Sequence, residues 1–92
     1  MTIELFFSPI CPHCPKAREI LLEVLEEVNH KIRLEEVNVF STEGVKKAEK
    51  YGVMAVPAII VNRKRKIVGV PSKEGLLRVI RQEIVKERTE SG

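Results

Sequence analysis

Apolar residues recur along this chain with two different spacings, and these spacings predict where strands and helices lie. A short apolar run at residues 3–7 stops at Ser8-Pro9, which is typical of a strand. From about Pro12 to Val28, apolar residues recur at helical spacing between charged ones, which predicts an amphipathic helix. Its apolar face would consist of Ala17, Ile20, Leu21, Val24, Leu25 and Val28.

The next two elements complete a strand–helix–strand unit. Residues 32–39 favour a second strand, and two strands joined through a long helix almost always run parallel with a right-handed crossover. A shorter helix is expected over 43–50, because Ser41 can cap its start and Gly52 can supply a left-handed turn at its end.

The C-terminal part of the chain predicts a hairpin and a last helix. Two apolar runs, 58–61 and 66–70, flank a short basic turn, which suits antiparallel pairing. Ser72 can cap the last helix, whose buried face would consist of Leu76, Leu77, Val79, Ile80, Ile84 and Val85. The order β-α-β-α-β-β-α predicts an α/β fold with a four-stranded mixed sheet and helices on both faces.

Length and composition predict one folded domain over residues 1–92. The chain is 43% hydrophobic and 32% charged but only 4% aromatic, so we expect a core built from Val, Ile and Leu. The N-terminus does not pair a basic region with a long apolar segment. We therefore expect a cytoplasmic protein that neither is secreted nor spans a membrane.

The net charge of +3 is mild, and its dense basic cluster is Arg63–Lys66. That cluster lies between two apolar runs and has no interleaved aromatic residues on which nucleic-acid bases could stack, so we expect no nucleic-acid partner. The simplest interpretation is a solvated hairpin turn. A docking patch for an acidic partner is the alternative.

Both cysteines lie in the segment Cys11-Pro12-His13-Cys14, between the first strand and the first helix. In a reducing cytosol such a close pair tends to be catalytic or metal-bound rather than a structural staple. A structural zinc site needs two further ligands, and outside this segment His30 is the other soft ligand, so we expect no metal or cofactor in a monomer. Zinc or iron shared between two subunits remains an alternative. The favoured interpretation is a redox reaction centre.

Three motifs, in this order and over about the whole chain, resemble the thioredoxin superfamily. They are Phe7-Ser8-Pro9-Ile10-Cys11-Pro12-His13-Cys14, Met54-Ala55-Val56-Pro57 and Val68-Gly69-Val70-Pro71-Ser72-Lys73-Glu74. The chain is most similar to the short thioredoxins and glutaredoxin-like proteins of archaea. This resemblance implies a thioredoxin-like fold with a cis bond between Val56 and Pro57, facing the cysteines. It also implies that the backbone of Val56 pairs with an extended substrate segment, and that Gly69 keeps the neighbouring surface flat.

The two cysteines are expected to play different roles. Cys11 is the candidate nucleophile, because the N–H groups and positive dipole at the start of the helix would stabilise its thiolate. Cys14, one turn further on, is expected to be more buried and to act as the resolving thiol, which attacks the mixed disulfide and releases the product.

Neighbours of the cysteines are expected to modulate the site. Pro12 suits the first helical position, where its missing N–H group costs nothing. Pro15 lies in the first turn whether the helix begins at Pro12 or Cys14 is its cap, and the sequence leaves both registers open. His13, when protonated, would favour a thiolate at Cys11 and make the pair a better oxidant. A solvated histidine with little effect is the alternative.

A carboxylate near the cysteines is the last candidate site residue. Most thioredoxins carry a buried aspartate in the first strand, where this chain has Leu5, so another group or water would have to accept the proton of Cys14. Glu36 lies in the second strand, roughly where thioredoxins place a lysine beneath the active site. It could relay that proton, and an exposed strand glutamate is the alternative.

The activity that these features predict is reduction or exchange of protein disulfides by a monomer. Its partners would be disulfide-containing proteins and an electron donor, either a reductase or a low-molecular-weight thiol. One alternative is a glutaredoxin-like enzyme that uses glutathione or another low-molecular-weight thiol. Lys16 and Arg18 lie close to the site, but they do not form a full binding pattern for the carboxylates of such a thiol. The other is a redox-sensing adaptor that binds partners through Arg63–Lys66.

Overall fold

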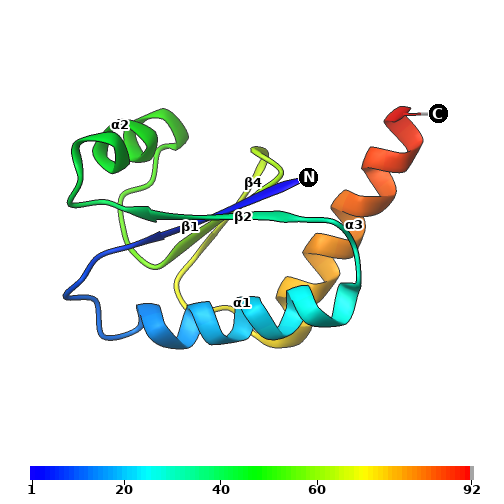
Figure 1. The fold of residues 1–92 in the computed structure, drawn as a ribbon, viewed down its shortest axis with the longest axis horizontal. Coiled ribbons are helices and arrows are strands. Elements are labelled where there is room, and N and C mark those ends of the chain that lie inside the picture. Colours follow the sequence, from blue (N-terminus) through cyan, green and yellow to red (C-terminus); the bar gives the residue numbers. More distant parts are fainter. Residues whose placement is uncertain (92) are drawn as a thin grey trace.

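The computed structural model describes residues 1–91 and places the elements in the predicted order (Figure 1). The strands are β1 (Thr2–Phe7), β2 (Arg33–Asn38), β3 (Ala58–Val61) and β4 (Arg65–Val68). The helices are α1 (Cys14–Val28), α2 (Thr42–Tyr51) and α3 (Lys73–Ser91). Within the described residues, none of these helices is both long enough and apolar enough to cross a membrane.

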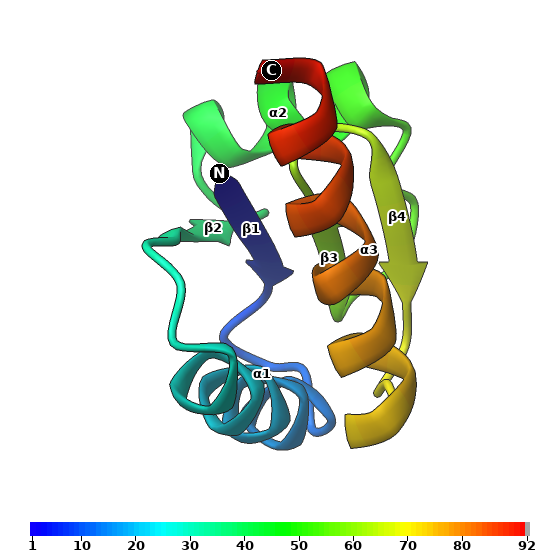
Figure 2. The same cartoon turned by 90° about the vertical axis from the view of Figure 1, so that its right-hand side faces the viewer.

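The strands form one mixed sheet in the order β2-β1-β3-β4, which confirms the predicted fold class. β1 runs parallel to β2 and antiparallel to β3, and β4 pairs antiparallel with β3. Helices α1 and α3 pack on one face of the sheet, and α2 covers the other (Figures 1 and 2). The central position of β1 explains why its side chains are buried on both faces.

Successive side chains of β1 point to opposite faces of the sheet, so the core has two layers. Ile3 and Leu5 point toward α1 and α3, where they join a cluster with Leu21 and Ile80. Phe6 points to the opposite face and meets the ring of Tyr51 in α2 edge-on, with the ring centroids 6.1 Å apart. The aliphatic core expected from composition therefore lies mainly between the sheet and the α1–α3 pair.

Glu4 is a buried carboxylate in the central strand β1, with only 2% of its surface exposed. It lies on the α2 face, where Lys47 Nζ is 3.5 Å from its Oε2 atom and 2.9 Å from Oε2 of Glu35. The hydrogen bond between Lys47 and Glu35 raises the pKa of Lys47 and lowers that of Glu35. A buried charge needs such a partner, so Lys47 makes the glutamate in β1 tolerable.

The start of α1 differs from both registers that the sequence left open. His13 is the N-cap, Cys14 is the first helical residue and Pro15 is the second, so Pro12 lies before the helix. The N–H group of Cys11 donates to the carbonyl of Ser8 at 3.2 Å, which turns the chain before the helix can begin. The prediction that Pro12 opens the helix was therefore wrong, whereas Pro15 does lie in the first turn.

Other element ends follow local chemistry. Ser41 caps α2 by accepting a hydrogen bond from the Gly44 N–H at 2.9 Å, and Gly52 ends that helix with φ of 66°, both as predicted. The strand expected over 66–70 ends at Val68, because Gly69 adopts φ of 88° and leaves the extended conformation.

The buried face of α3 also differs from the prediction. Val85 is 59% exposed, while Glu83 is fully buried. Residues 76, 80 and 83 follow one another at helical spacing and face inward, and Val85 lies on the other side. Lys86 Nζ and Arg65 Nη1 approach its Oε2 atom to 3.4 Å and 3.9 Å and offset part of the cost of burying the charge, although neither carboxylate oxygen accepts a hydrogen bond from the described residues.

Replacing Leu21 with alanine is expected to lower the free energy of unfolding by about 2–5 kcal/mol, the usual cost of emptying a core position. Leu21 is fully buried, whereas Leu22 on the same helix is 37% exposed. The matched variant Leu22→Ala is expected to cost less than about 1 kcal/mol. Urea denaturation with the disulfide kept oxidised compares the two variants, and equal losses would contradict this orientation of α1.

Candidate active site

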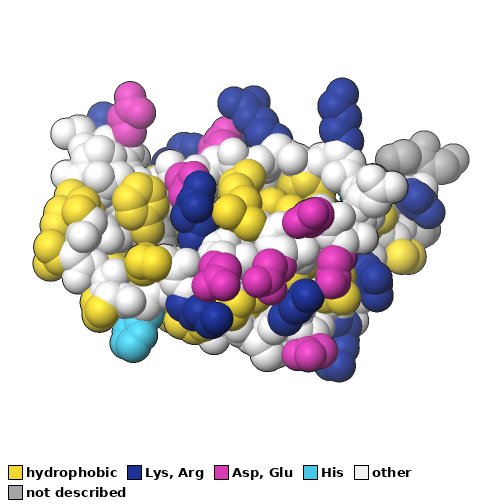
Figure 3. Space-filling view, turned by 60° about the horizontal axis from the view of Figure 1, so that its bottom comes forward, with side chains coloured by type: hydrophobic (Ala, Val, Ile, Leu, Met, Phe, Trp, Pro, Cys, Tyr) yellow, Lys and Arg dark blue, Asp and Glu magenta, His cyan; other side chains and the backbone are white. Residues whose placement is uncertain are grey.

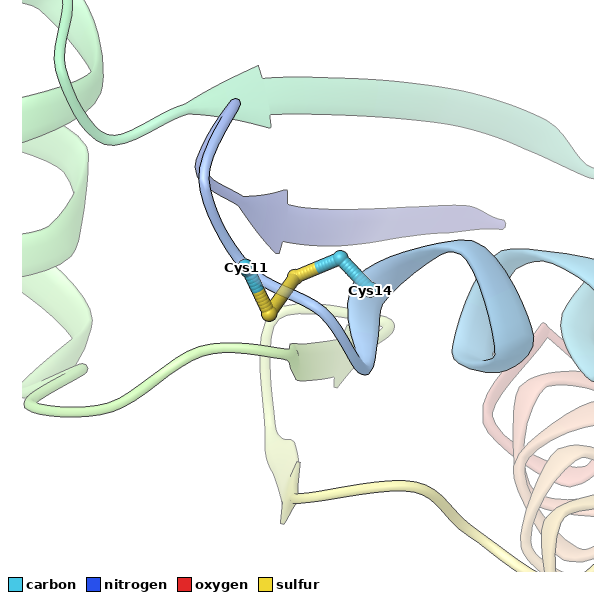
Figure 4. Close-up of a disulfide and its surroundings, with 2 residues drawn as sticks. All are labelled: Cys11 and Cys14. Carbon is cyan, nitrogen blue, oxygen red and sulfur yellow. A yellow bond between two sulfur atoms is a disulfide. The ribbon is translucent and has the colours of Figure 1, made fainter.

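Cys11 and Cys14 form a disulfide between the end of β1 and the start of α1 (Figure 4). Their Cα atoms are 5.5 Å apart. Cys14 is buried, with 6% of its surface exposed, whereas Cys11 is only partly buried. The predicted difference in burial between the two thiols is therefore confirmed.

Backbone pairing holds the loop that carries these cysteines. Beyond the end of β1, the Phe7 carbonyl accepts a hydrogen bond at 2.9 Å from the N–H group of Val39, which follows β2. Ser8 is buried, and its carbonyl accepts the N–H group of Cys11. Because the disulfide ties Cys11 to the first residue of α1, the Cys11 sulfur lies at the N-terminal end of that helix.

The strand register brings the three sequence motifs to one end of the sheet. Phe6 pairs with Ala58, and Ala58 pairs with Val68, so the segments that adjoin these three residues lie together. The peptide bond between Val56 and Pro57 is cis, as predicted. The N–H group of Gly69 donates to the Pro57 carbonyl at 2.8 Å, which links the second motif to the third.

Gly69 has the features expected of a residue on an open surface. Its φ of 88° lies in the region that favours glycine. A Cβ atom added there would meet nothing within 4 Å, so packing inside the protein does not require glycine at this position. The absence of a side chain leaves space beside Pro57. The role in substrate approach that the resemblance implies for Gly69 stays a prediction.

We define the disulfide end of the molecule as the connections at residues 8–13, 39–41, 52–57 and 69–72. These connections contain no Asp, Glu, Lys or Arg, although 32% of the chain is charged. Each of them exposes one large apolar side chain, and these are Ile10, Phe40, Met54 and Val70, with exposed fractions of 78%, 61%, 96% and 41%. Apolar side chains gather at the left of Figure 3, which is also the side where these connections lie in Figure 1.

A cavity of about 280 Å³ adjoins the disulfide on the α1 face of the sheet. It is lined by Leu5, Phe7, Ser8, Pro9, Cys11, Cys14, Pro15, Arg18 and Glu36. Arg18 Nε donates to Glu36 Oε1 at 2.7 Å across this site. The structure thus brings Glu36 to the cysteines, although the carboxylate is 38% exposed because β2 is an edge strand.

The pairing of Arg18 with Glu36 was missed by the sequence analysis. Arg18 follows Cys14 by one helical turn and so lies on the same side of α1, a spacing that could have identified it. Pro12, His13, Val56, Pro57 and Gly69 do not line this cavity. A larger hollow of about 850 Å³ follows α3 and contains neither cysteine. Among residues 1–88, whose side chains the structure describes, His, Cys, Asp and Glu form no group of three or more that could hold a metal ion.

Comparisons with known sequences all match this chain to the same family. A family model described as a thioredoxin domain matches residues 1–81. The thioredoxin of Methanocaldococcus jannaschii is 43% identical over 82 residues, which cover 89% of this chain and 94% of that protein. A probable thioredoxin of Methanothermobacter thermautotrophicus is 42% identical over 84 residues, which cover 91% of this chain and 96% of that protein.

Solved structures show a similar fold at lower identity. The solution structure of a thioredoxin-like protein from Clostridium perfringens matches with a TM-score of 0.78 and 21% identity, covering 88% of this chain and 68% of that one. Oxidised mitochondrial thioredoxin 3 from Saccharomyces cerevisiae matches with a TM-score of 0.73 and 19% identity, covering 88% and 76%.

The similarity to known proteins extends over the residues of the reaction centre as well as over the fold. The matched family model covers both cysteines, the cis proline and the hairpin that carries Gly69. Cys11 and Cys14 lie within disulfide distance where β1 meets α1. The chain therefore belongs to the thioredoxin family of disulfide oxidoreductases.

Proposed function

We propose that this protein reduces disulfides in protein substrates, with Cys11 as the nucleophile and Cys14 as the resolving thiol. The observation that carries the assignment is the unequal burial of two bonded cysteines, of which Cys14 is 6% exposed and Cys11 is more accessible. An incoming disulfide can reach the outer sulfur before the inner one. The start of α1 favours a thiolate at the same sulfur.

The reaction consists of two exchanges. The Cys11 thiolate attacks one sulfur of the substrate disulfide, forms a mixed disulfide and releases the other substrate sulfur as a thiolate, which takes up a proton. Cys14 then loses its proton and attacks Cys11, which forms the intramolecular disulfide and releases the second substrate thiol. Two electrons pass from the enzyme dithiol to the substrate, and a reductase returns them to the enzyme.

The substrate segment is proposed to lie beside the cis proline. Val56 and Pro57 directly precede β3, whose first residue, Ala58, pairs with the end of β1. An extended segment placed there would run alongside Val56 as an added strand, with its disulfide near Cys11. The open space above Gly69 supports this approach, because no side chain obstructs it.

The absence of charge from the disulfide end supports an apolar protein substrate over glutathione. Glutathione carries two carboxylates, whereas the disulfide end has no Lys or Arg to bind them. Lys16 and Arg18, which follow Cys14 in α1, face Glu19 at 3.6 Å and Glu36 at 2.7 Å, and Lys66 donates to the Gly52 carbonyl at 2.9 Å. The four exposed apolar side chains instead favour contact with uncharged residues that flank the substrate cysteines.

The contacts of the basic turn argue against an adaptor role. Arg65 donates to Gln82 and Lys66 donates to the Gly52 carbonyl, each at 2.9 Å, so these cations have partners within the protein. The turn also joins the ends of β3 and β4 that lie away from the disulfide. The turn and the cysteines therefore lie at opposite ends of the β3–β4 hairpin.

We further propose that the protein acts as a monomer in the cytoplasm. The support for the cytoplasm is the single pair of cysteines, whose close spacing is of the kind used for redox catalysis in reducing compartments.

The variant Cys14→Ser is expected to accumulate a mixed disulfide between Cys11 and a disulfide-bonded substrate protein, because resolution is blocked. Cys11→Ser is the matched control and is expected to form far less adduct and to lose turnover. Mass spectrometry under non-reducing conditions measures the adduct and locates the linked cysteine. Adduct formation mainly through Cys14 would reverse the assigned roles.

Placing a negative charge on the disulfide end is expected to weaken binding of an apolar substrate. Met54→Glu should raise KM for an uncharged disulfide peptide by about fivefold or more, equivalent to about 1 kcal/mol of lost contact, with little change in kcat. Val85→Glu is the matched control, since Val85 is exposed on α3 and outside the disulfide end. Equal KM values for both variants would contradict a docking role for this surface.

A further inference from the structure

The carboxylate of Glu36 lines the cavity beside the disulfide, and it takes no part in the two thiol–disulfide exchanges as described above. Of the residues that line it, the titratable ones are Cys11, Cys14, Arg18 and Glu36. Once Cys11 is joined to substrate, Cys14 must lose its proton before it can attack. Glu36 is then the acidic side chain in the lining that could receive this proton.

The strand register explains how Glu36 reaches the cavity. Leu5 and Glu36 are partners across the parallel pair β1–β2, so their side chains lie on the same face of the sheet, toward α1. Leu5 forms part of the cavity wall and has no ionisable group. Glu36 on the edge strand supplies the carboxylate that position 5 lacks, and remains 38% exposed.

Arg18 holds this carboxylate from the opposite wall. Its Nε atom donates to Glu36 Oε1 at 2.7 Å, a charge-assisted hydrogen bond between a helix and a strand. The same contact places a positive charge beside the carboxylate, so that an ionised Glu36 opposes a Cys14 thiolate less strongly. Arg18 thus both orients the acceptor and offsets its charge.

Other charged groups near Glu36 belong to a different layer. A second hollow, which Glu36 shares, is lined on the α2 side by Arg33, Glu35, Glu43 and Lys47. Lys47 contacts Glu35 and Glu4 there, and Arg33 Nε is 3.3 Å from Glu35 Oε1. Within the lining of the disulfide cavity, the titratable groups that face Glu36 are therefore the two cysteines and Arg18, and Arg18 carries the charge.

We infer that Glu36, oriented by Arg18, accepts the proton of Cys14 through cavity water during the resolving step. This inference rests on the proposed function. The volume of about 280 Å³ leaves room for water between thiol and carboxylate, and water bridges of this kind conduct protons in active sites. The proton moves from Cys14 Sγ to Glu36, the sulfur–sulfur bond to Cys11 forms, and the departing substrate thiolate takes up a proton.

The test separates the two exchanges with an aromatic disulfide whose thiolate product absorbs visible light. Under stopped flow, the reduced protein releases one product thiolate when Cys11 attacks and a second when Cys14 resolves. Glu36→Gln is expected to leave the first phase unchanged and to slow the second at pH 7 by about tenfold or more, within reach of the usual contribution of a general base. Its second phase should then rise with hydroxide concentration.

Glu35→Gln is the matched control, since Glu35 is the preceding residue of β2 and contacts Lys47 on the other side. It is expected to leave both phases unchanged. Arg18→Met should slow the second phase in the wild-type background, and most of that effect should vanish beside Glu36→Gln if Arg18 acts through Glu36. Independent, multiplying effects of the two substitutions would contradict the positioning role of Arg18.

The sign of the effect separates proton transfer from simple electrostatics. Without Glu36, the Arg18 guanidinium would favour a Cys14 thiolate, so a purely electrostatic role predicts a faster second phase in Glu36→Gln. A second phase that is unchanged or faster would overturn the inference. Failure of Cys14→Ser to trap a Cys11 adduct would instead overturn the proposed function, whatever the behaviour of Glu36.

Discussion

The pairing of β1 with a parallel strand on one side and an antiparallel strand on the other is the constraint on which the site depends. Parallel pairing with β2 brings the connections after both strands to one end, and antiparallel pairing with β3 places Pro57 at that same end. The hydrogen bond from Gly69 to Pro57 then adds the connection after β4. Cys11 and Gly69, which are 58 positions apart in the sequence, are brought to the same end of the sheet by strand register.

The elements and the reaction centre could be predicted from the sequence because each had a local signal. Helical spacing, turn residues and the cysteine spacing are properties of neighbouring residues, and the three motifs carried the cis proline. The burial of Glu83 and of Glu4 had no such local signal, because it depends on cationic side chains of other elements, Arg65 and Lys47. The start of α1 also depended on a hydrogen bond between Cys11 and Ser8 that spacing alone does not reveal.

Charge is distributed between the two ends of the sheet in a way that fits the proposed chemistry. The disulfide end has no formal charge, whereas the connection at the opposite end of the β3–β4 hairpin carries Arg63 and Lys64. An uncharged apolar surface around an accessible sulfur admits many protein segments, because it makes few directional demands. The charged residues of the chain lie outside this surface and so do not interfere at the site of exchange.

The position of Glu36 resolves a conflict between burial and proton transfer. A carboxylate at position 5 would lie in the central strand, where Leu5 is only 1% exposed, and would need a dedicated cation to offset its desolvation. Glu4, one residue away, illustrates that requirement, since its burial is accompanied by the contact with Lys47. On the edge strand, Glu36 keeps one side toward water and the other toward the cysteines. Arg18 can then hold it with a single hydrogen bond, and the proton can leave to solvent without crossing the core.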